Sequence, residues 1–236
     1  MWNDRTALLL GANDIAKLQA AHVLVVGLGG VGGMAAEMLA RAGVGTLTLI
    51  DADSINESNI NRQIMALHST IGKAKVEVTA QRLRDINPEI VLHPHALFLR
   101  DQILEEYAQR KYSAVIDAID TLSPKMFLII TASRAGNAVV SAMGAGGRLD
   151  PRYIRLGNFW EAQGCHLARS LRKRFRRIGF DLPFSAVYST EPAIKEAVIE
   201  YEGEPNKKSR TGVISYMPNL FGSYAAAEAI RIILER

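Results

Sequence analysis

The sequence predicts an α/β protein built on an open, mostly parallel sheet with helices on both faces, extended by antiparallel strands in its C-terminal part. Short apolar, β-branched runs alternate with segments of helical periodicity, and a glycine-rich turn joins the first run to a helix. The 236 residues, 48% of them hydrophobic, suffice for one large core. We therefore expect residues 1–236 to form a single domain, with a core over 20–147 and an extension over 148–236.

The first strand and its turn are the most informative stretch. Residues 22–26 predict a strand buried on both faces. The glycines after it form a GxGxxG pattern, Gly27, Gly29 and Gly32, with Gly30 and Gly33 as two extra glycines. Glycine lets the backbone bend tightly and lets phosphate oxygens approach its N–H groups, and the helix over 31–42 directs its positive end to the same place. A glycine-rich helix cap without a ligand is the alternative. Because Asp51 ends the next predicted strand (46–50), the whole context favours a Rossmann-like nucleotide site.

The remaining elements continue the alternation of helices and strands. In chain order, the sequence predicts a helix within 1–21, a helix over 71–86, a strand over 90–92, a helix over 101–110, a strand over 113–116, a helix starting at Ser123-Pro124 and a strand over 139–140. The extension predicts an antiparallel strand over 153–156, a basic helix over 166–178, an exposed mobile loop over 200–212 and an amphipathic helix over 220–234.

Composition excludes several classes of protein. No uninterrupted apolar run reaches about 18 residues and no signal peptide is evident, so we expect no membrane span and a cytoplasmic location. A single cysteine, Cys165, excludes an internal disulfide and a cysteine-rich zinc site. We interpret Cys165 as an inert thiol rather than a sulfur or acyl carrier. His93 and His95 are expected at the surface, because two histidines alone do not make a metal site.

Polar side chains gather after the predicted strands. The loop DADSINESNINRQ holds an acidic, amide and basic set, and two further charged residues follow: Asp51, Asp53, Asn59, Arg62, Gln63, Lys75 and Asp120. In an open α/β sheet these positions face one crevice. Basic groups there neutralise a triphosphate and stabilise an oxyanion as pyrophosphate leaves, and carboxylates can hold magnesium. This set exceeds what a nicotinamide cofactor needs, although a nicotinamide-dependent oxidoreductase remains an alternative.

The motifs GLGGVGG, DADSINESNINRQ, GKAKVE and DAIDT resemble, in order and spacing, the ubiquitin-activating-enzyme-like adenylyltransferases, which include the sulfur-carrier adenylyltransferases. The resemblance covers roughly residues 20–147 and implies an ATP-binding adenylating core that uses ATP and Mg²⁺. It implies that Arg62, Lys75 and Asp120 are catalytic and that Asp120 positions the metal. The nucleotide-binding residues that it implies are Gly27, Gly29, Gly30, Gly32, Asp51, Asp53, Asn59, Arg62, Gln63 and Lys75.

The extension narrows this resemblance. GAGGRLDPRYIRL, AVYSTE and SYMPNLFGSYAAAEAI are similar to segments of the tRNA threonylcarbamoyladenosine dehydratases. The resemblance implies ATP-dependent cyclisation (dehydration) of threonylcarbamoyladenosine in tRNA through a carboxylate adenylate, by a homodimer. The alternative is an adenylyltransferase that activates the C-terminus of a ubiquitin-like sulfur-carrier protein, which the missing CxxC pair disfavours. Whether a monovalent cation or a sulfur-relay protein takes part stays open.

A basic cluster on the helix expected over 166–178 is the candidate tRNA-binding surface: Arg169, Arg172, Lys173, Arg174, Arg176 and Arg177. A solvated helix face and a non-catalytic tRNA-binding protein are the alternatives. Lys207, Lys208 and Arg210 form a weaker cluster. In the family an N-terminal arginine reaches across the dimer to ATP, and the matching position here is Leu8, with Arg5 one helical turn earlier as the candidate substitute.

Overall fold

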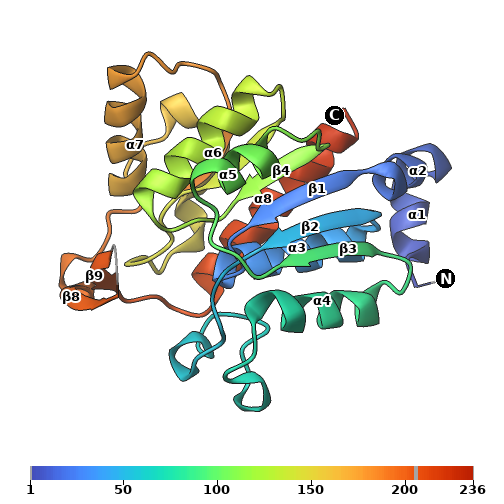
Figure 1. Ribbon diagram of the computed structural model, residues 1–236, viewed down its shortest axis with the longest axis horizontal. Helices are drawn as coiled ribbons and strands as arrows, with labels where there is room; N and C mark the ends of the chain where they lie inside the picture. The colour runs from blue at the N-terminus through green and yellow to red at the C-terminus, as the bar shows by residue number, and fades with distance from the viewer. Residues whose placement is uncertain (1, 205–206, 236) are drawn as a thin grey trace.

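The computed structural model describes residues 2–204 and 207–235, and within them a seven-stranded sheet has the order β3-β2-β1-β4-β5-β7-β6 (Figure 1). Its strands are β1 (His22–Val26), β2 (Thr46–Ile50), β3 (Val91–His95), β4 (Ala114–Asp117), β5 (Val139–Ala142), β6 (Ile154–Asn158) and β7 (Ser185–Ser189). Neighbouring strands are parallel except β6, which is antiparallel to β7. The fold class predicted from the sequence is confirmed.

Helices cover both faces of the sheet. Their bounds are α1 (Asp4–Leu10), α2 (Ala12–Ala20), α3 (Gly30–Ala42), α4 (Lys75–Ile86), α5 (Asp101–Ala108), α6 (Leu122–Arg134), α7 (His166–Arg177) and α8 (Tyr216–Ile233). Short 3-10 turns lie at η1 (Glu57–Asn59), η2 (His68–Thr70), η3 (Pro151–Tyr153), η4 (Phe159–Glu161) and η5 (Lys195–Ala197). Figure 1 shows α5, α6 and α7 over one face, whereas α3, α4 and α8 cover the other. Among the described residues, no helix combines the length and apolarity needed to cross a membrane.

Strand β1 shows how the two hydrophobic layers arise. Val23 and Val25 pack with α3 and α8, whereas Leu24 and Val26 pack in the layer with α5, α6 and α7. Successive strand side chains point to opposite faces, so a continuous apolar run fits a strand covered on both sides. Each large aliphatic side chain that is fully buried stabilises the fold by roughly 1.5–3 kcal/mol. The sheet is therefore a rigid platform for the loops at its carboxyl edge.

Three expectations about elements are wrong in detail. The N-terminal helix is two helices, α1 and α2, which meet at Gly11 with φ of 81°. The helix expected to begin at Ser123-Pro124 starts at Leu122, so Pro124 lies at its third position. Proline is tolerated there because the first four helical N–H groups have no intrahelical acceptor.

The mobile loop expected over 200–212 instead contains two paired strands, with residues 205 and 206 outside the described residues. Strands β8 (Val198–Glu204) and β9 (Lys207–Thr211) pair antiparallel and stand apart from the sheet at the lower left of Figure 1. Polar strands that pair mainly through their backbones lack the hydrophobic period that reveals a buried strand. The side chains of Lys207, Lys208 and Arg210 lie outside the described residues.

The strand order places a topological switch point at the carboxyl ends of β1 and β4, and we call this region the crevice, after the place where such proteins bind ligands. The connections from β1 and β4 lead to opposite sides of the sheet, which is the topological switch point where α/β proteins bind ligands. The backbone N–H of Gly27 donates to Ile50 O over 2.8 Å, and that of Ala118 donates to Val26 O over 2.9 Å. These bonds tie the loop after β1 to the end of β2 and the loop after β4 to the end of β1.

Candidate active site

The glycine-rich turn after β1 forms one wall of the crevice. Gly27 has φ of 86°, a conformation that side chains disfavour, and a Cβ at Gly32 would stand 1.7 Å from Gly27 O. At Gly29, by contrast, a Cβ would meet only Gln63 Nε2, at 3.8 Å. Gly29 is also the residue that precedes α3, so the positive end of that helix faces the same open space. The turn therefore offers a cradle for an anion on the side of Gly29.

Asp51, at the end of β2, holds this turn in place. Its Oδ2 accepts a hydrogen bond from Leu28 N over 2.6 Å, and its Oδ1 accepts one from Asp53 N over 2.8 Å. Burial raises the pKa of Asp51 above its ordinary value, whereas the Lys75 ammonium and these two backbone N–H groups act in the opposite direction. Each carboxylate oxygen retains a second lone pair, so the same group can still accept a ribose hydroxyl.

Lys75 is a buried cation at the first position of α4. Its residue is 5% exposed, and its Nζ lies 2.7 Å from Asp53 Oδ2 and 3.9 Å from Asp51 Oδ1. Its backbone N–H donates to Asp53 O over 3.0 Å. Lys75 therefore ties the start of α4 to the loop after β2 and keeps a positive charge beside two carboxylates.

The SNINRQ loop supplies the amide and guanidinium groups. Asn59 and Gln63 are buried, and Asn59 Oδ1 accepts from Asn56 N over 3.2 Å. Within the described part of the chain, the buried Oε1 of Gln63 has no hydrogen-bond partner. Arg62 donates from Nη1 to Ser58 O over 2.7 Å and to the Asn61 carboxamide over 2.8 Å. Because buried polar atoms rarely stay unpaired, the Gln63 carboxamide beside Gly29 indicates a ligand position.

Asp120 lies on the opposite wall, in the segment between β4 and α6. Asp120 is exposed and lies two positions after Ala118. The carbonyl carbon and oxygen of Ala118 border Gly27. Helix α6 begins two residues later at Leu122. The topology therefore brings Asp120 to the same crevice as the glycine-rich turn.

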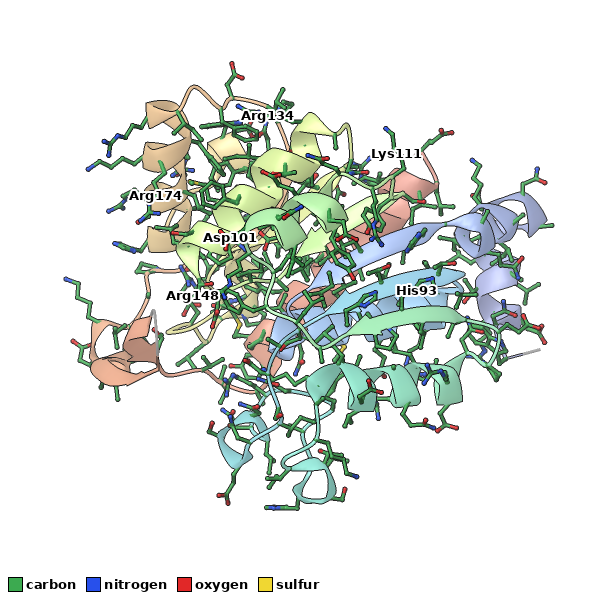
Figure 2. The ribbon with its side chains drawn as sticks, in the orientation of Figure 1. His93, Asp101, Lys111, Arg134, Arg148 and Arg174 are labelled. Atoms are coloured by element: carbon green, nitrogen blue, oxygen red, sulfur yellow. The ribbon has the colours of Figure 1, made fainter. Side chains whose placement is uncertain are left out.

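Helix α7 carries the basic cluster, and most of that cluster faces solvent. Arg169, Lys173, Arg174, Arg176 and Arg177 are exposed, and Figure 2 shows nitrogen-tipped side chains extending from the outer side of this helix. Arg174 donates from Nη1 to Ser123 Oγ over 3.1 Å, which brings α7 against the start of α6, close to Asp120 in sequence. The exposed cluster is thus joined to the start of α6, at a residue three positions after Asp120.

Arg172 is placed differently from the other five. Its Nη1 donates to Phe159 O and Ala162 O, and its guanidinium carbon lies 5.8 Å from the centre of the Phe159 ring. Burial and the nearby charge of Arg176 lower the pKa of Arg172. Arg172 is therefore engaged in holding the segment before α7.

Two buried cations near the crevice, Lys125 and Arg148, were not predicted from the sequence. Lys125 pairs with Asp117 beneath the loop that leads to Asp120. Arg148, labelled in Figure 2, donates to the carbonyl oxygens of Gly144, Gly146, Gly164 and Glu191. A lone lysine ahead of the apolar run MFLIITA was a signal for Lys125, because such a residue needs a buried partner. Nothing in the sequence around Arg148 distinguishes it from a surface arginine.

Comparison with known proteins places this site in a family. Residues 3–236 match the model of the ThiF family. The chain belongs to the ThiF family. A relative from Haemophilus influenzae, named tRNA threonylcarbamoyladenosine dehydratase, is 35% identical over 237 residues, which cover 95% of this chain and 90% of the relative.

Solved structures of the corresponding Escherichia coli protein agree with this membership of the ThiF family. The E. coli tRNA N6-threonylcarbamoyladenosine dehydratase in complex with ATP superposes with a TM-score of 0.89 at 34% identity, covering 99% of this chain and 93% of that one. The same protein in complex with AMP gives a TM-score of 0.88 at 36% identity, with coverages of 98% and 93%. The resemblance inferred from the sequence motifs is confirmed over nearly the full chain.

Proposed function

We propose that this protein is an ATP-dependent tRNA threonylcarbamoyladenosine dehydratase. The substrate carboxylate attacks the α-phosphorus of ATP, which forms an acyl-adenylate and releases pyrophosphate. An atom of the tethered carbamoyl group then attacks the activated carbonyl carbon, closes the ring and displaces AMP. The observation that carries this proposal is the full-length similarity to dehydratases whose solved structures bind ATP and AMP.

The crevice fits ATP on structural grounds. The open cradle at Gly29 and the unpaired Oε1 of Gln63 provide space and a polar contact beside the end of α3. We assign the phosphates to the glycine-rich turn, since backbone N–H groups and a helix N-terminus favour anions. We assign the ribose to Asp51 and the triphosphate to Asn59, Arg62, Gln63 and Lys75.

Charge in the crevice suits adenylyl transfer. Arg62 and Lys75 supply positive charge that counters the oxyanion formed as pyrophosphate leaves. We assign Mg²⁺ to Asp120, because magnesium is usually held by one or two carboxylates together with substrate phosphates. No group of three acidic, histidine or cysteine side chains that could hold a metal alone occurs in the described residues. Magnesium bound with the nucleotide would add positive charge at the phosphates.

The second half of the reaction needs no enzyme nucleophile. Cys165 is buried beside the start of α7, which argues against a thioester carrier. Ring closure instead uses a group already tethered to the adenylate, and such intramolecular reactions gain effective concentrations of about 10⁵ M or more. The alternative of an adenylyltransferase for a ubiquitin-like sulfur carrier is not favoured.

The tRNA backbone is assigned to the exposed face of α7. Phosphate neutralisation by arginine and lysine supplies most nucleic-acid affinity, and Arg174 brings this face next to the start of α6. A target base in the crevice and phosphates on α7 would then be bound at the same time. The division into an adenylating core over 20–147 and an extension over 148–236 follows these two tasks, although β6 and β7 of the extension complete the sheet.

We further propose a homodimer that acts in the cytoplasm, where its tRNA substrate is found. On helix α1, the solvent-exposed fractions of Leu8 and Leu9 are 87% and 80%. Arg5 lies on the same short helix. Apolar side chains exposed to this degree fit a contact with a second copy. The reaction as written requires neither a monovalent cation nor a sulfur-relay protein.

Mass spectrometry of tRNA nucleosides tests this function. Incubation of threonylcarbamoylated tRNA with ATP and the protein is expected to yield the cyclic nucleoside with equal amounts of AMP and pyrophosphate. Arg62→Ala and Asp120→Ala are expected to abolish both products while keeping the fold. No pyrophosphate release with this tRNA, or release that depends instead on a small protein ending in Gly-Gly, would overturn the proposal.

A further inference from the structure

A buried ion pair lies directly beneath the crevice. Lys125 on α6 and Asp117 at the end of β4 are both 0% exposed, and Lys125 Nζ stands 2.7 Å from Asp117 Oδ2. Removing two charges from water costs free energy that their attraction offsets only in part, so a buried pair is weak support for stability. Its hydrogen bonds indicate what else it does.

The ammonium of Lys125 uses all its donors. Besides Asp117, its Nζ donates to Ile119 O over 3.0 Å and to Ala142 O over 2.8 Å. An ammonium has three N–H groups, so these three acceptors satisfy it fully. Lys125 thereby links the loop after β4 to the end of β5.

Asp117 accepts a hydrogen bond from the backbone N–H of Ile119, whose carbonyl Lys125 binds. Its Oδ1 accepts from Ile119 N over 3.1 Å, and its Oδ2 accepts from Ser141 Oγ over 2.5 Å. Both polar backbone groups of Ile119 are therefore fixed, the N–H by Asp117 and the carbonyl by Lys125. The carbonyl of Ile119 belongs to the peptide bond that leads into Asp120.

We propose that Lys125 and Asp117 are positioning residues that set the direction of the Asp120 carboxylate. The inference rests on the proposed role of Asp120 in holding magnesium with ATP. Asp120 lies in the segment between β4 and α6, directly after Ile119. The buried pair fixes both polar backbone groups of Ile119, the residue before Asp120, whereas Asp120 itself is exposed.

The experiment separates positioning from folding. In Lys125→Met, Asp117 stays buried without its counter-charge, so the melting temperature should fall. In the double variant Lys125→Met/Asp117→Asn no charge is unpaired, so the melting temperature should return most of the way. The double variant still lacks the hydrogen bond from Lys125 Nζ to Ile119 O. Because small displacements of catalytic groups cost about 100-fold in rate, AMP formation should fall by about 10-fold to 100-fold, with a raised Mg²⁺ requirement.

The ratio of ATP affinity with Mg²⁺ to that without Mg²⁺ is the second measurement. It should fall in the double variant, and in an Asp120→Asn background the double substitution should change it no further. This ratio needs no tRNA, so it tests the positioning role even if the wild-type protein forms no cyclic nucleoside. The control is Glu37→Gln/Arg82→Gln, which removes an ion pair between the buried Glu37 on α3 and Arg82 on α4. This variant should leave the ratio of ATP affinities unchanged. A double variant that regains both stability and the wild-type ratio would overturn the positioning role.

Discussion

The crevice and the outer face of α7 carry charge in opposite ways. In the crevice, the Lys75 ammonium is buried and paired with Asp53 on the loop after β2. On α7, apolar residues such as Phe175 anchor the helix, and the charged side chains stand in solvent. Groups that are fixed before the substrate arrives can stabilise a transition state, whereas exposed charges act through screened attraction. Substitutions should therefore have large effects on turnover in the crevice and small, salt-dependent effects on α7.

Lys75→Met should give the largest loss. It removes a fixed positive charge beside the phosphates and leaves Asp51 without its nearest cation, so AMP formation should fall by about 100-fold to 1000-fold. Steady-state AMP release measures this change. Lys73→Met is the matched control, because Lys73 is exposed two positions earlier, and it should retain normal turnover. Equal losses in both variants would contradict a specific role for Lys75.

Two glycines of the same turn should respond differently. Gly29→Ala places a methyl group in open space, so the protein should fold normally but bind ATP at least about 10-fold more weakly. Gly32→Ala places the methyl group 1.7 Å from Gly27 O, so the melting temperature should drop sharply. Calorimetric ATP binding and thermal melting distinguish the two. Normal ATP affinity in a folded Gly29→Ala variant would show that the phosphates do not bind against Gly29.

Substitution of the α7 face should weaken tRNA binding without changing ATP affinity. For Arg169→Gln/Lys173→Gln/Arg177→Gln, the slope of log affinity for tRNA against log salt should shrink by about 2 to 3, since each lost phosphate contact removes about 0.7 to 0.9. Filter binding over a salt series measures the slope. Arg172→Gln is the control, because that guanidinium binds backbone carbonyls, and it should alter stability more than the slope. An unchanged slope in the triple variant would show that tRNA binds elsewhere.

The smallest effect concerns the amino end of the sheet. Burial and the charges of His93 and Arg110 lower the pKa of His22, whose Nε2 lies 2.8 Å from Thr48 Oγ1. The unfolded chain, with a pKa of about 6.5, then binds the proton more readily, so stability falls as the pH drops below that value. His22→Gln should lessen this fall in urea midpoints, with the part due to His95 remaining. The exposed control His68→Gln should lose stability at low pH as the wild type does. If the urea midpoint of His22→Gln fell as much as that of the wild type, His22 would not be a source of the pH dependence.

The sequence predicted where the glycine-rich turn and Asp51 lie because these residues form continuous motifs. The glycines must be glycines for steric reasons, and Asp51 follows its strand directly, so local spacing determines their placement. Contacts between distant segments were not predictable in this way. The pair Lys125–Asp117 and the four carbonyls around Arg148 depend on how separate loops meet after folding. Likewise, the periodicity of α7 gave the helix but did not show that Arg172 turns inward.

The central claim is that a carboxylate of the tRNA substrate becomes bonded to the adenylyl group of ATP. Isotope transfer tests this most directly. Threonylcarbamoylated tRNA with a heavy isotope at both oxygens of the threonyl carboxylate is incubated with ATP and the protein, and the AMP is analysed by mass spectrometry. The account predicts one heavy oxygen in each AMP formed, because the acyl–oxygen bond breaks during ring closure. Cyclic nucleoside formed with unlabelled AMP, or with label in phosphate instead, would contradict it.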